Sequence, residues 1–168
     1  MKTTAYLIAV FATLSIAALG SQAQSKNTTI QVDVDKIKNA TGMMACALFN
    51  VADGFPDVQA KSFQYVYVSI NSGVASCEFK DLSAGTYAVS VFHDENDNKK
   101  LDKNFVGMPL EGYGVSNNIR HMLSAPEFKE SSFQVNGEVD KNIKIRMGYW
   151  LEGNQTFFWL RLKFFLNP

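Results

Sequence analysis

Polar and apolar residues alternate from residue 29 onward, where Ile30, Val32 and Val34 are separated by polar neighbours. A period of two is typical of a β-strand with one buried face. Six later segments are rich in β-branched and aromatic residues and end at turn residues, which favours a strand in each. The predicted strands cover residues 29–35, 43–50, 63–70, 74–82, 86–93, 131–135 and 142–150.

Turn signals between these segments indicate the fold class. Gly42 and Gly85 each lie between two predicted strands, and the link at residues 71–73, Asn-Ser-Gly, suits a β-hairpin. No segment beyond the first 23 residues shows a sustained helical period, which excludes a parallel α/β fold. About seven short strands with regular turns predict an all-β protein, a single antiparallel β-sandwich.

The N-terminal residues differ from this pattern. A lysine precedes an apolar run from Ala5 to Leu19, and Ser21 and Ala23 are small residues at the positions that a signal peptidase recognises. The run is shorter than the roughly 20 residues of a spanning helix, and no cysteine follows it directly for lipid attachment. We therefore expect a cleaved signal peptide, residues 1–23, and a mature protein in the periplasm or outside the cell, without a transmembrane helix.

The predicted sandwich covers residues 24–149, and residues 150–168 form a C-terminal extension. Apolar side chains in this extension alternate with Arg161 and Lys163. The period of two predicts an extra edge strand, and a membrane-surface segment is the alternative.

Charge and cysteine content narrow the function classes. Lys plus Arg and Asp plus Glu each number 16, so the formal net charge is +0 at pH 7. A nucleic-acid surface needs a basic excess, so we expect no nucleic-acid partner. Cys46 and Cys77 both lie in predicted strands. In an oxidising compartment they could form one disulfide, and two separate buried thiols are the alternative.

The stretch HDENDNKKLD, residues 93–102, concentrates oxygen-bearing side chains at the end of a predicted strand. Calcium takes about six to eight oxygen ligands, which one loop can supply when side-chain oxygens recur at every second position. Here acids and amides occupy relative positions one, three, five and nine, and a backbone carbonyl would serve at position seven. The spacing therefore predicts a calcium site formed by Asp94, Asn96, Asn98, Lys100 and Asp102.

Two positions depart from an EF-hand-type loop. Lys99 stands at position six, where a glycine would turn the chain, and Phe105 at position twelve, where an acid would bind the ion. A left-handed residue other than glycine costs about 1 kcal/mol. Few carboxylates predict weak binding, with a Kd of about 10⁻⁴–10⁻³ M. A solvated turn whose acids are screened by Lys99, Lys100 and Lys103 is the alternative.

Three motifs in a fixed order resemble a known family. They are GTYA at residues 85–88, FHDENDNKKLD at residues 92–102 and GMPLEGYGVSN at residues 107–117. The combination is similar to the secreted bacterial family called domain of unknown function 2141. The resemblance implies an immunoglobulin-like or transthyretin-like sandwich outside the cytoplasm. Family members commonly carry glycine beside the loop asparagines, and this chain has Asp97 and Lys99 there.

These observations favour a non-enzymatic module that binds an envelope protein or a glycan. The segment GMPLEGYGVSNN would form a surface loop beside the calcium site, with Tyr113 as an aromatic contact. Glu111 or Asn117 would then hold the loop in place through hydrogen bonds to its backbone.

Two other functions remain open from the sequence. A hydrolase would use His93 or His121 as a base and Ser116 as a nucleophile, although no Gly-x-Ser-x-Gly elbow is present. A carbohydrate-binding module is suggested by aromatic residues, which also fill sandwich cores. These aromatic residues are Tyr113, Tyr149, Trp150 and Trp159.

Overall fold

The computed structural model describes residues 28–105, 107–121, 124–137 and 139–149. The predicted signal peptide and the C-terminal extension lie outside the described residues. The strands are β1 (Thr28–Asp35), β2 (Met43–Phe49), β3 (Gln64–Val68), β4 (Ala75–Leu82), β5 (Gly85–Asp94), β6 (Tyr113–Val115), β7 (Phe133–Val135) and β8 (Lys141–Arg146). The helices are short: η1 (Gln59–Lys61), η2 (Ser116–Asn118) and α1 (Phe128–Ser131). Within the described ranges, no helix is long and apolar enough to span a membrane.

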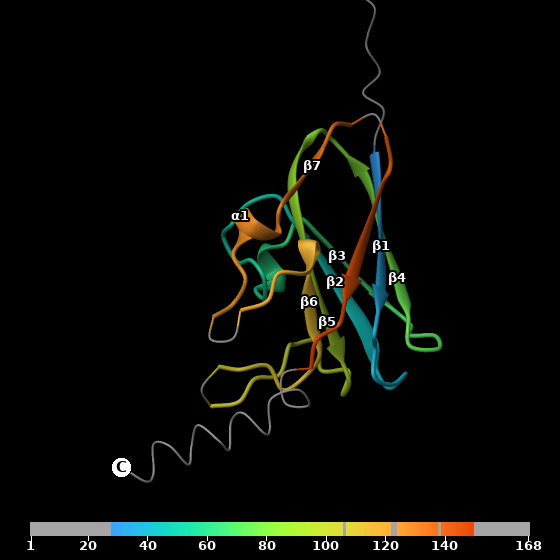
Figure 1. Ribbon diagram of the computed structural model, residues 1–168, viewed down its shortest axis with the longest axis vertical. Helices are drawn as coiled ribbons and strands as arrows, with labels where there is room; N and C mark the ends of the chain where they lie inside the picture. Colours follow the sequence, from blue (N-terminus) through green and yellow to red (C-terminus); the bar gives the residue numbers. More distant parts are fainter. Residues whose placement is uncertain (1–27, 106, 122–123, 138, 150–168) are drawn as a thin grey trace, which may run out of the picture.

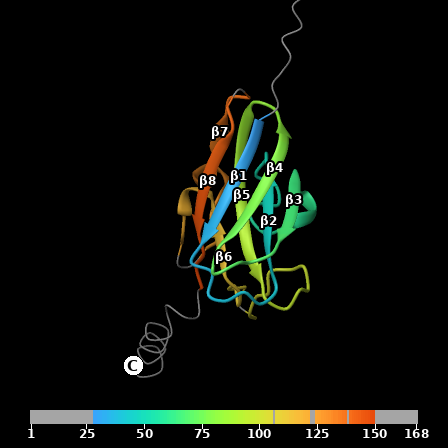
Figure 2. The same cartoon turned by 90° about the vertical axis from the view of Figure 1, so that its right-hand side faces the viewer.

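The strands form two sheets that face each other (Figures 1 and 2). One sheet has the order β4-β1-β8, and the other has the order β3-β2-β5-β6. β7 pairs with the first residues of β5. Seven of these strands lie in the predicted segments, so the mostly-β class is confirmed. β6 is the exception, because it lies in a stretch rich in glycine and proline for which no strand is predicted.

Two expectations about strand pairing are wrong. β8 pairs with β1 in parallel, so the smaller sheet is mixed rather than antiparallel. β3 and β4 do not form a hairpin, because β3 pairs with β2 and β4 pairs with β1 in the other sheet. The link at residues 71–73 forms only an isolated bridge between Asn71 and Val74 while the chain passes from one sheet to the other.

The hydrophobic core lies between the two sheets. In β1 the predicted alternation is present, since Ile30, Val32 and Val34 are all buried. They pack in one cluster with apolar residues of the larger sheet, and burying each such side chain contributes about 1.5–3 kcal/mol. Cys46 of β2 and Cys77 of β4 form a disulfide across this core, with their Cα atoms 6.5 Å apart. The predicted disulfide is therefore confirmed.

The outer face of the larger sheet is also covered. Phe49 of β2 contacts Phe55 edge to face, and Phe55 contacts Phe128 of α1 in the same way. The hydroxyl of Ser90 in β5 donates a hydrogen bond of 2.6 Å to the carbonyl oxygen of Pro56. The connection between β2 and β3 therefore lies over the outer face of the larger sheet. The loop that was predicted to bind calcium begins at the last residue of β5.

Candidate functional site

The loop predicted to bind calcium begins at the last residue of β5, Asp94, whose side chain is fully buried. β5 is an inner strand that pairs with β2 on one side and β6 on the other, so its end is held firmly. Gly42 packs against the backbone carbonyl of Asp94. The first predicted ligand is therefore a carboxylate at a rigid position.

The carboxylate of Asp94 turns the following chain back on itself. Its Oδ1 accepts a hydrogen bond from the backbone N–H of Asn98 at 3.1 Å, and its Oδ2 accepts one from Lys99 at 2.9 Å. Asp97 and Lys99 adopt φ values of 55° and 62°, in the left-handed region. The expected left-handed turn at position six is thus present without a glycine.

Asp102 closes the loop by binding two asparagines. Its Oδ2 accepts a hydrogen bond from Nδ2 of Asn96 at 2.7 Å, and its Oδ1 accepts one from Nδ2 of Asn98 at 3.0 Å. The oxygen of each amide accepts a backbone N–H instead, from Asn98 and Lys100 respectively. The structure therefore brings the four predicted side-chain ligands together in one hydrogen-bonded group.

Glu111 holds the two ends of the loop together. Its Oε1 accepts the backbone N–H of Glu95 and its Oε2 that of Asp102, both at 3.0 Å. The side chain is buried, and this burial raises the pKa of Glu111, while the two backbone N–H donors lower it. The nearby charges of Asp102 and Asp94 raise the pKa further. The sequence suggested that Glu111 holds the GMPLEGYGVSNN segment in place, but not that it joins the two ends of the preceding loop.

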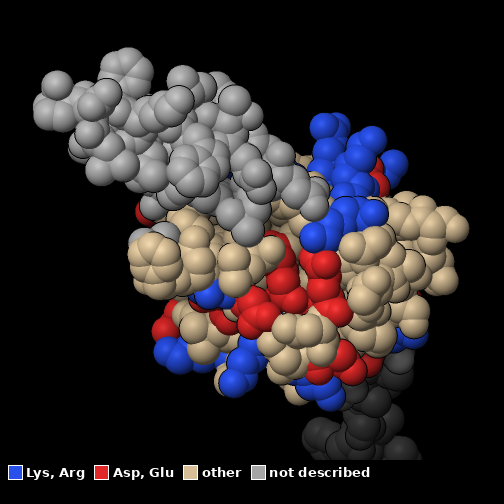
Figure 3. All heavy atoms as spheres, turned by 90° about the horizontal axis from the view of Figure 1, so that it is seen from below, with Lys and Arg blue, Asp and Glu red and all other residues tan. Residues whose placement is uncertain are grey.

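Seen from this end of the molecule, acidic side chains gather at the centre of the face, and lysine and arginine side chains lie around them (Figure 3). Lys103 forms an ion pair with Asp57, a residue of the β2–β3 connection. In the described part of the chain, Lys99 and Lys100 form no ion pair. Glu95 of this loop forms an ion pair of 2.9 Å with Lys38, so direct lysine contacts neutralise the acids of the loop only in part.

The donor set suits a hard cation only if amide oxygens take part. No group of three or more His, Cys, Asp or Glu side chains among the described residues is arranged to hold a metal ion. The two carboxylates of Asp94 and Asp102 would need the oxygens of Asn96 and Asn98 and a backbone carbonyl beside them. Oxygen ligands of this kind fit calcium and do not fit zinc, which prefers sulfur and nitrogen.

His93 is fully buried, and both of its ring nitrogens have hydrogen-bond partners. Nε2 lies 2.7 Å from the carbonyl oxygen of Thr41, which can only accept, so Nε2 carries the proton. Nδ1 lies 2.9 Å from the hydroxyl of Tyr149, which itself accepts the N–H of Lys38. Tyr149 therefore donates to Nδ1, and His93 has no nitrogen left to act as a base or a metal ligand.

The residues of the hydrolase alternative are not assembled. The hydroxyl of Ser116 donates to the carbonyl oxygen of Ser131 at 2.5 Å and accepts the N–H of Val89 at 2.9 Å. His121 instead contacts a carboxylate oxygen of Glu130 at 2.5 Å. Within the described ranges no hydrogen bond joins Ser116 to a histidine. Ser116 therefore links η2 to β5 and to α1 and is not an activated nucleophile.

Asn117 has a structural position beside Ser116. Its φ of 62° is left-handed, and its amide nitrogen donates to the carbonyl oxygens of Glu130 and Ser132. These bonds attach η2 to the α1 segment. The expectation that Asn117 fixes the loop backbone agrees with these contacts.

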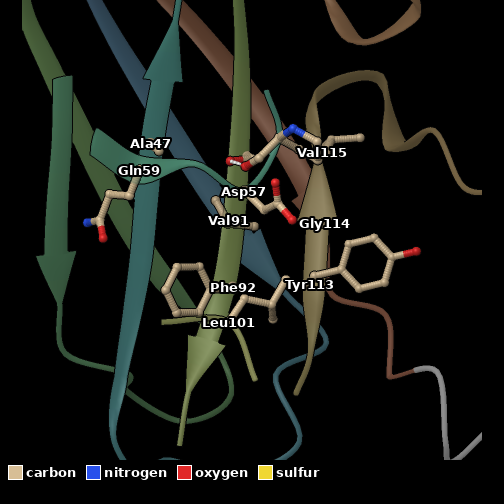
Figure 4. Close-up of a pocket in the computed structure, with 11 residues that line it drawn as sticks. Ala47, Asp57, Gln59, Val91, Phe92, Leu101, Tyr113, Gly114 and Val115 are labelled. Atoms are coloured by element: carbon tan, nitrogen blue, oxygen red, sulfur yellow. Dashed lines mark hydrogen bonds between the residues drawn. The ribbon is translucent and has the colours of Figure 1, made fainter. Parts of the chain in front are cut away.

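Tyr113 lies half-buried at the start of β6, beside a cleft that the sequence did not suggest. Two adjoining hollows share Pro56, Asp57, Leu101 and Tyr113. In Figure 4 the side chain of Leu101 lies between the rings of Phe92 and Tyr113, and the carboxylate of Asp57 points toward β6. We call this hollow the Tyr113 cleft. Its principal lining residues are Pro56, Asp57, Leu101, Lys103, Tyr113 and His121.

Comparison with known proteins places the chain in a family. Neither a curated protein nor a solved structure matches it. A family model described as an uncharacterized protein conserved in bacteria (DUF2141) matches residues 32–144, well over half of the chain. The matched range contains the β5 strand, the loop after it and the GMPLEGYGVSN segment. The chain therefore belongs to this family of bacterial proteins, DUF2141.

Proposed function

We propose that this chain is a non-enzymatic module of the cell envelope or the extracellular space, and that the loop after β5 binds calcium. Its two facing sheets would form a β-sandwich of the immunoglobulin-like or transthyretin-like type. The bound ion would balance the carboxylates of Asp94 and Asp102, which form no ion pair with a lysine among the described residues. The proposed ligands are side-chain oxygens of Asp94, Asn96, Asn98 and Asp102 and the carbonyl oxygen of Lys100.

The observation that carries this proposal is the convergence of four side chains from alternate positions. Asp102 contacts Asn96 and Asn98 directly, and Asp94 binds the backbone of Asn98. The first of these side chains is a buried carboxylate, and the two backbone N–H groups that it accepts hold the turn in place at the end of β5. The nearby carboxylate of Glu111 adds to the negative charge that a cation would balance.

Binding would require the two asparagine amides to turn. Asn96 and Asn98 donate their amide nitrogens to Asp102 in the structure. Half a turn of each amide about its last side-chain bond presents an oxygen in place of a nitrogen of similar size. Because this rotation gives up hydrogen bonds and only two carboxylates take part, we expect weak affinity, with a Kd of about 10⁻⁴–10⁻³ M.

The disulfide between Cys46 and Cys77 supports a location outside the cytoplasm, because disulfides persist in oxidising compartments. The N-terminal sequence supports the same location through its apolar run and small residues. We expect the mature protein to begin at Gln24. Intact-mass measurement of protein from its native host checks this, and a chain that retains Met1 would contradict it.

Thermal melting of the purified protein tests the calcium proposal. Millimolar calcium should raise the melting temperature relative to excess chelator, with a gain of about 1.4 kcal/mol at ten times Kd. Asp102→Asn should remove most of this gain, because a neutral amide attracts a dication less than a carboxylate. Magnesium should substitute poorly, since it demands compact octahedral coordination.

Asp97→Asn is the matched control, since it removes the same charge from the same loop but not a proposed ligand. It should keep the calcium-dependent gain. Equal melting temperatures with calcium and chelator, together with no binding heat in calorimetry, would contradict the proposal. If the Asp97 and Asp102 variants lost the calcium-dependent gain in melting temperature equally, the gain would reflect general charge screening and not a specific site.

A further inference from the structure

The Tyr113 cleft is built from parts of the chain that are far apart in sequence. Asp57 belongs to the connection between β2 and β3, and His121 follows η2. Leu101 lies within the loop that we propose to bind calcium, and Lys103 directly follows that loop. The ion pair between Asp57 and Lys103 joins two of these walls. Tyr113 lies where the two hollows meet, so its ring is accessible from within the cleft.

The walls of the cleft hold polar side chains in pairs. Asp57 binds Lys103, and His121 binds Glu130. Because Lys103 and His121 each have a carboxylate partner, the described residues of the cleft offer no unpaired positive charge to an anionic ligand. Pairing also fixes the positions of these side chains, so they can serve as oriented hydrogen-bond partners.

Several polar atoms in the cleft still have capacity for a ligand. Among the described residues, nothing hydrogen-bonds to the hydroxyl of Tyr113, to Oδ1 of Asp57 or to Nε2 of Gln59. These atoms include both donors and acceptors. In Figure 4 the amide of Gln59 and the hydroxyl of Tyr113 point to opposite sides, and apolar surface from Leu101 and from the ring of Tyr113 lies between them.

We propose that the Tyr113 cleft binds one ring or a few rings of a neutral saccharide. A sugar hydroxyl both donates and accepts hydrogen bonds, which matches a rim of mixed, paired polar groups. The C–H face of a sugar ring packs on an aromatic ring, as Tyr113 would allow. Ligand sites in proteins combine apolar surface with a few such placed polar groups. An anion would find no unpaired cation here, and a purely apolar ligand would leave the rim unsatisfied.

This inference deepens the proposed binding function by naming a ligand class and a site. It selects one of the aromatic residues that the sequence offered for carbohydrate binding. Tyr149 instead packs under Lys38 and hydrogen-bonds to His93. Trp150 and Trp159 lie outside the described residues. Leu101 lies between two proposed calcium ligands, Lys100 and Asp102, so an ordered loop should also tighten one wall of the cleft.

Affinity electrophoresis tests the inference with the purified full chain. The gels contain a β-glucan, an α-mannan, a xylan or a soluble N-acetylglucosamine polymer, and an acidic alginate serves as a charge control. At least one neutral polysaccharide should slow the protein. Tyr113→Ala should weaken this interaction roughly tenfold, the equivalent of one lost aromatic contact. Tyr113→Phe keeps the ring and should retain most of the binding.

Two matched controls separate the cleft from the general surface. Tyr65→Ala removes a tyrosine of β3 that is 56% exposed, outside the cleft, and should leave binding unchanged. Asp57→Asn should weaken binding. Asp53→Asn should not weaken binding, although this variant also loses an ion pair of the β2–β3 connection, the one between Asp53 and Lys61.

No retardation by any neutral polysaccharide would overturn the inference, as would retardation by alginate alone. Equal losses in Tyr113→Ala and Tyr65→Ala would also overturn it. A calcium-dependent rise in melting temperature without retardation would refute the saccharide site and leave the calcium proposal standing. Retardation of the protein without any effect of calcium on its melting temperature would refute the calcium proposal and leave the saccharide site standing.

Discussion

Gly42 limits which residues can stand at the base of the loop after β5. Its φ is +71°, and an added Cβ would lie 1.9 Å from the backbone carbonyl oxygen of Asp94. Gly107 has a similar φ of +81°, but nothing lies within 4 Å of the corresponding Cβ position. The two glycines therefore share the backbone requirement and differ in their surroundings.

We expect Gly42→Ala to destabilise the protein much more than Gly107→Ala. Both variants carry the left-handed cost of about 1 kcal/mol. Only Gly42→Ala adds a clash with backbone, and overpacking of this kind costs about 1–3 kcal/mol more. Urea unfolding of both variants measures the difference. Equal free energies of unfolding would show that the Gly42 contact relaxes easily.

Lys99 adopts a conformation that favours glycine, with φ at 62°. We expect Lys99→Gly to raise the free energy of unfolding by up to about 1 kcal/mol, less the entropy that glycine gains in the unfolded chain. Lys100 is the control, because its φ is not positive and glycine there should destabilise. Chemical unfolding with calcium chelated is the measurement. A less stable Lys99→Gly variant would contradict this account of the turn.

At the scale of elements, the connection from β5 to β6 depends on Glu111. Its carboxylate accepts backbone hydrogen bonds from Glu95 and Asp102, at the two ends of the loop. In Glu111→Gln, one of these N–H donors would face an amide nitrogen in place of an oxygen. We expect a loss of about 1–3 kcal/mol, the cost of an unsatisfied buried donor.

Glu78→Gln is the control for Glu111→Gln, since it neutralises a glutamate on the exposed side of β4 that pairs with Lys80. It should change the free energy of unfolding by about 0–1 kcal/mol, as for most surface ion pairs. Urea unfolding in chelator compares the two. Similar losses in both variants would mean that Glu111 acts only through its charge.

The strands were predictable because residues on the buried face of a strand are apolar at every second position, which is a local pattern. Ile30, Val32 and Val34 of β1 show this alternation, and all three are buried. The pairing of strands was not, because it depends on contacts between distant segments. The sequence link at residues 71–73 has the composition of a hairpin turn whether or not its two strands belong to one sheet. β6 was missed because three residues among glycines show no period.

In the candidate site, too, the features that depend on local spacing were predictable and those that depend on distant contacts were not. Alternate spacing within one loop predicted that Asp94, Asn96, Asn98 and Asp102 would converge, and their hydrogen bonds agree. The contact between Lys103 and Asp57 joins residues 46 positions apart, so no local pattern could indicate the cleft. His93 looked like a base in the sequence because burial and hydrogen-bond partners cannot be read from residue type.

At the scale of the whole molecule, the disulfide between Cys46 and Cys77 links the two sheets through a loop of 31 residues. We expect replacement of both cysteines by alanine to lower the free energy of unfolding by about 3–4 kcal/mol, chiefly because the unfolded chain gains freedom. Guanidinium unfolding under non-reducing conditions measures this. Wild-type protein whose disulfide is reduced in denaturant should lose the same free energy of unfolding. An unchanged unfolding midpoint in the double alanine variant would contradict the prediction.

The parallel pairing of β8 with β1 has a mechanical consequence. β1 opens the described part of the chain and β8 lies near its close, with residues 30–35 matched to residues 141–146 in the same direction. The beginning of β1 and the end of β8 therefore point to opposite ends of the molecule (Figure 1). A force that pulls these two ends apart loads the β1–β8 hydrogen bonds in shear, so that they share the load together. A domain tethered at both ends in this way would resist stretching along its long axis.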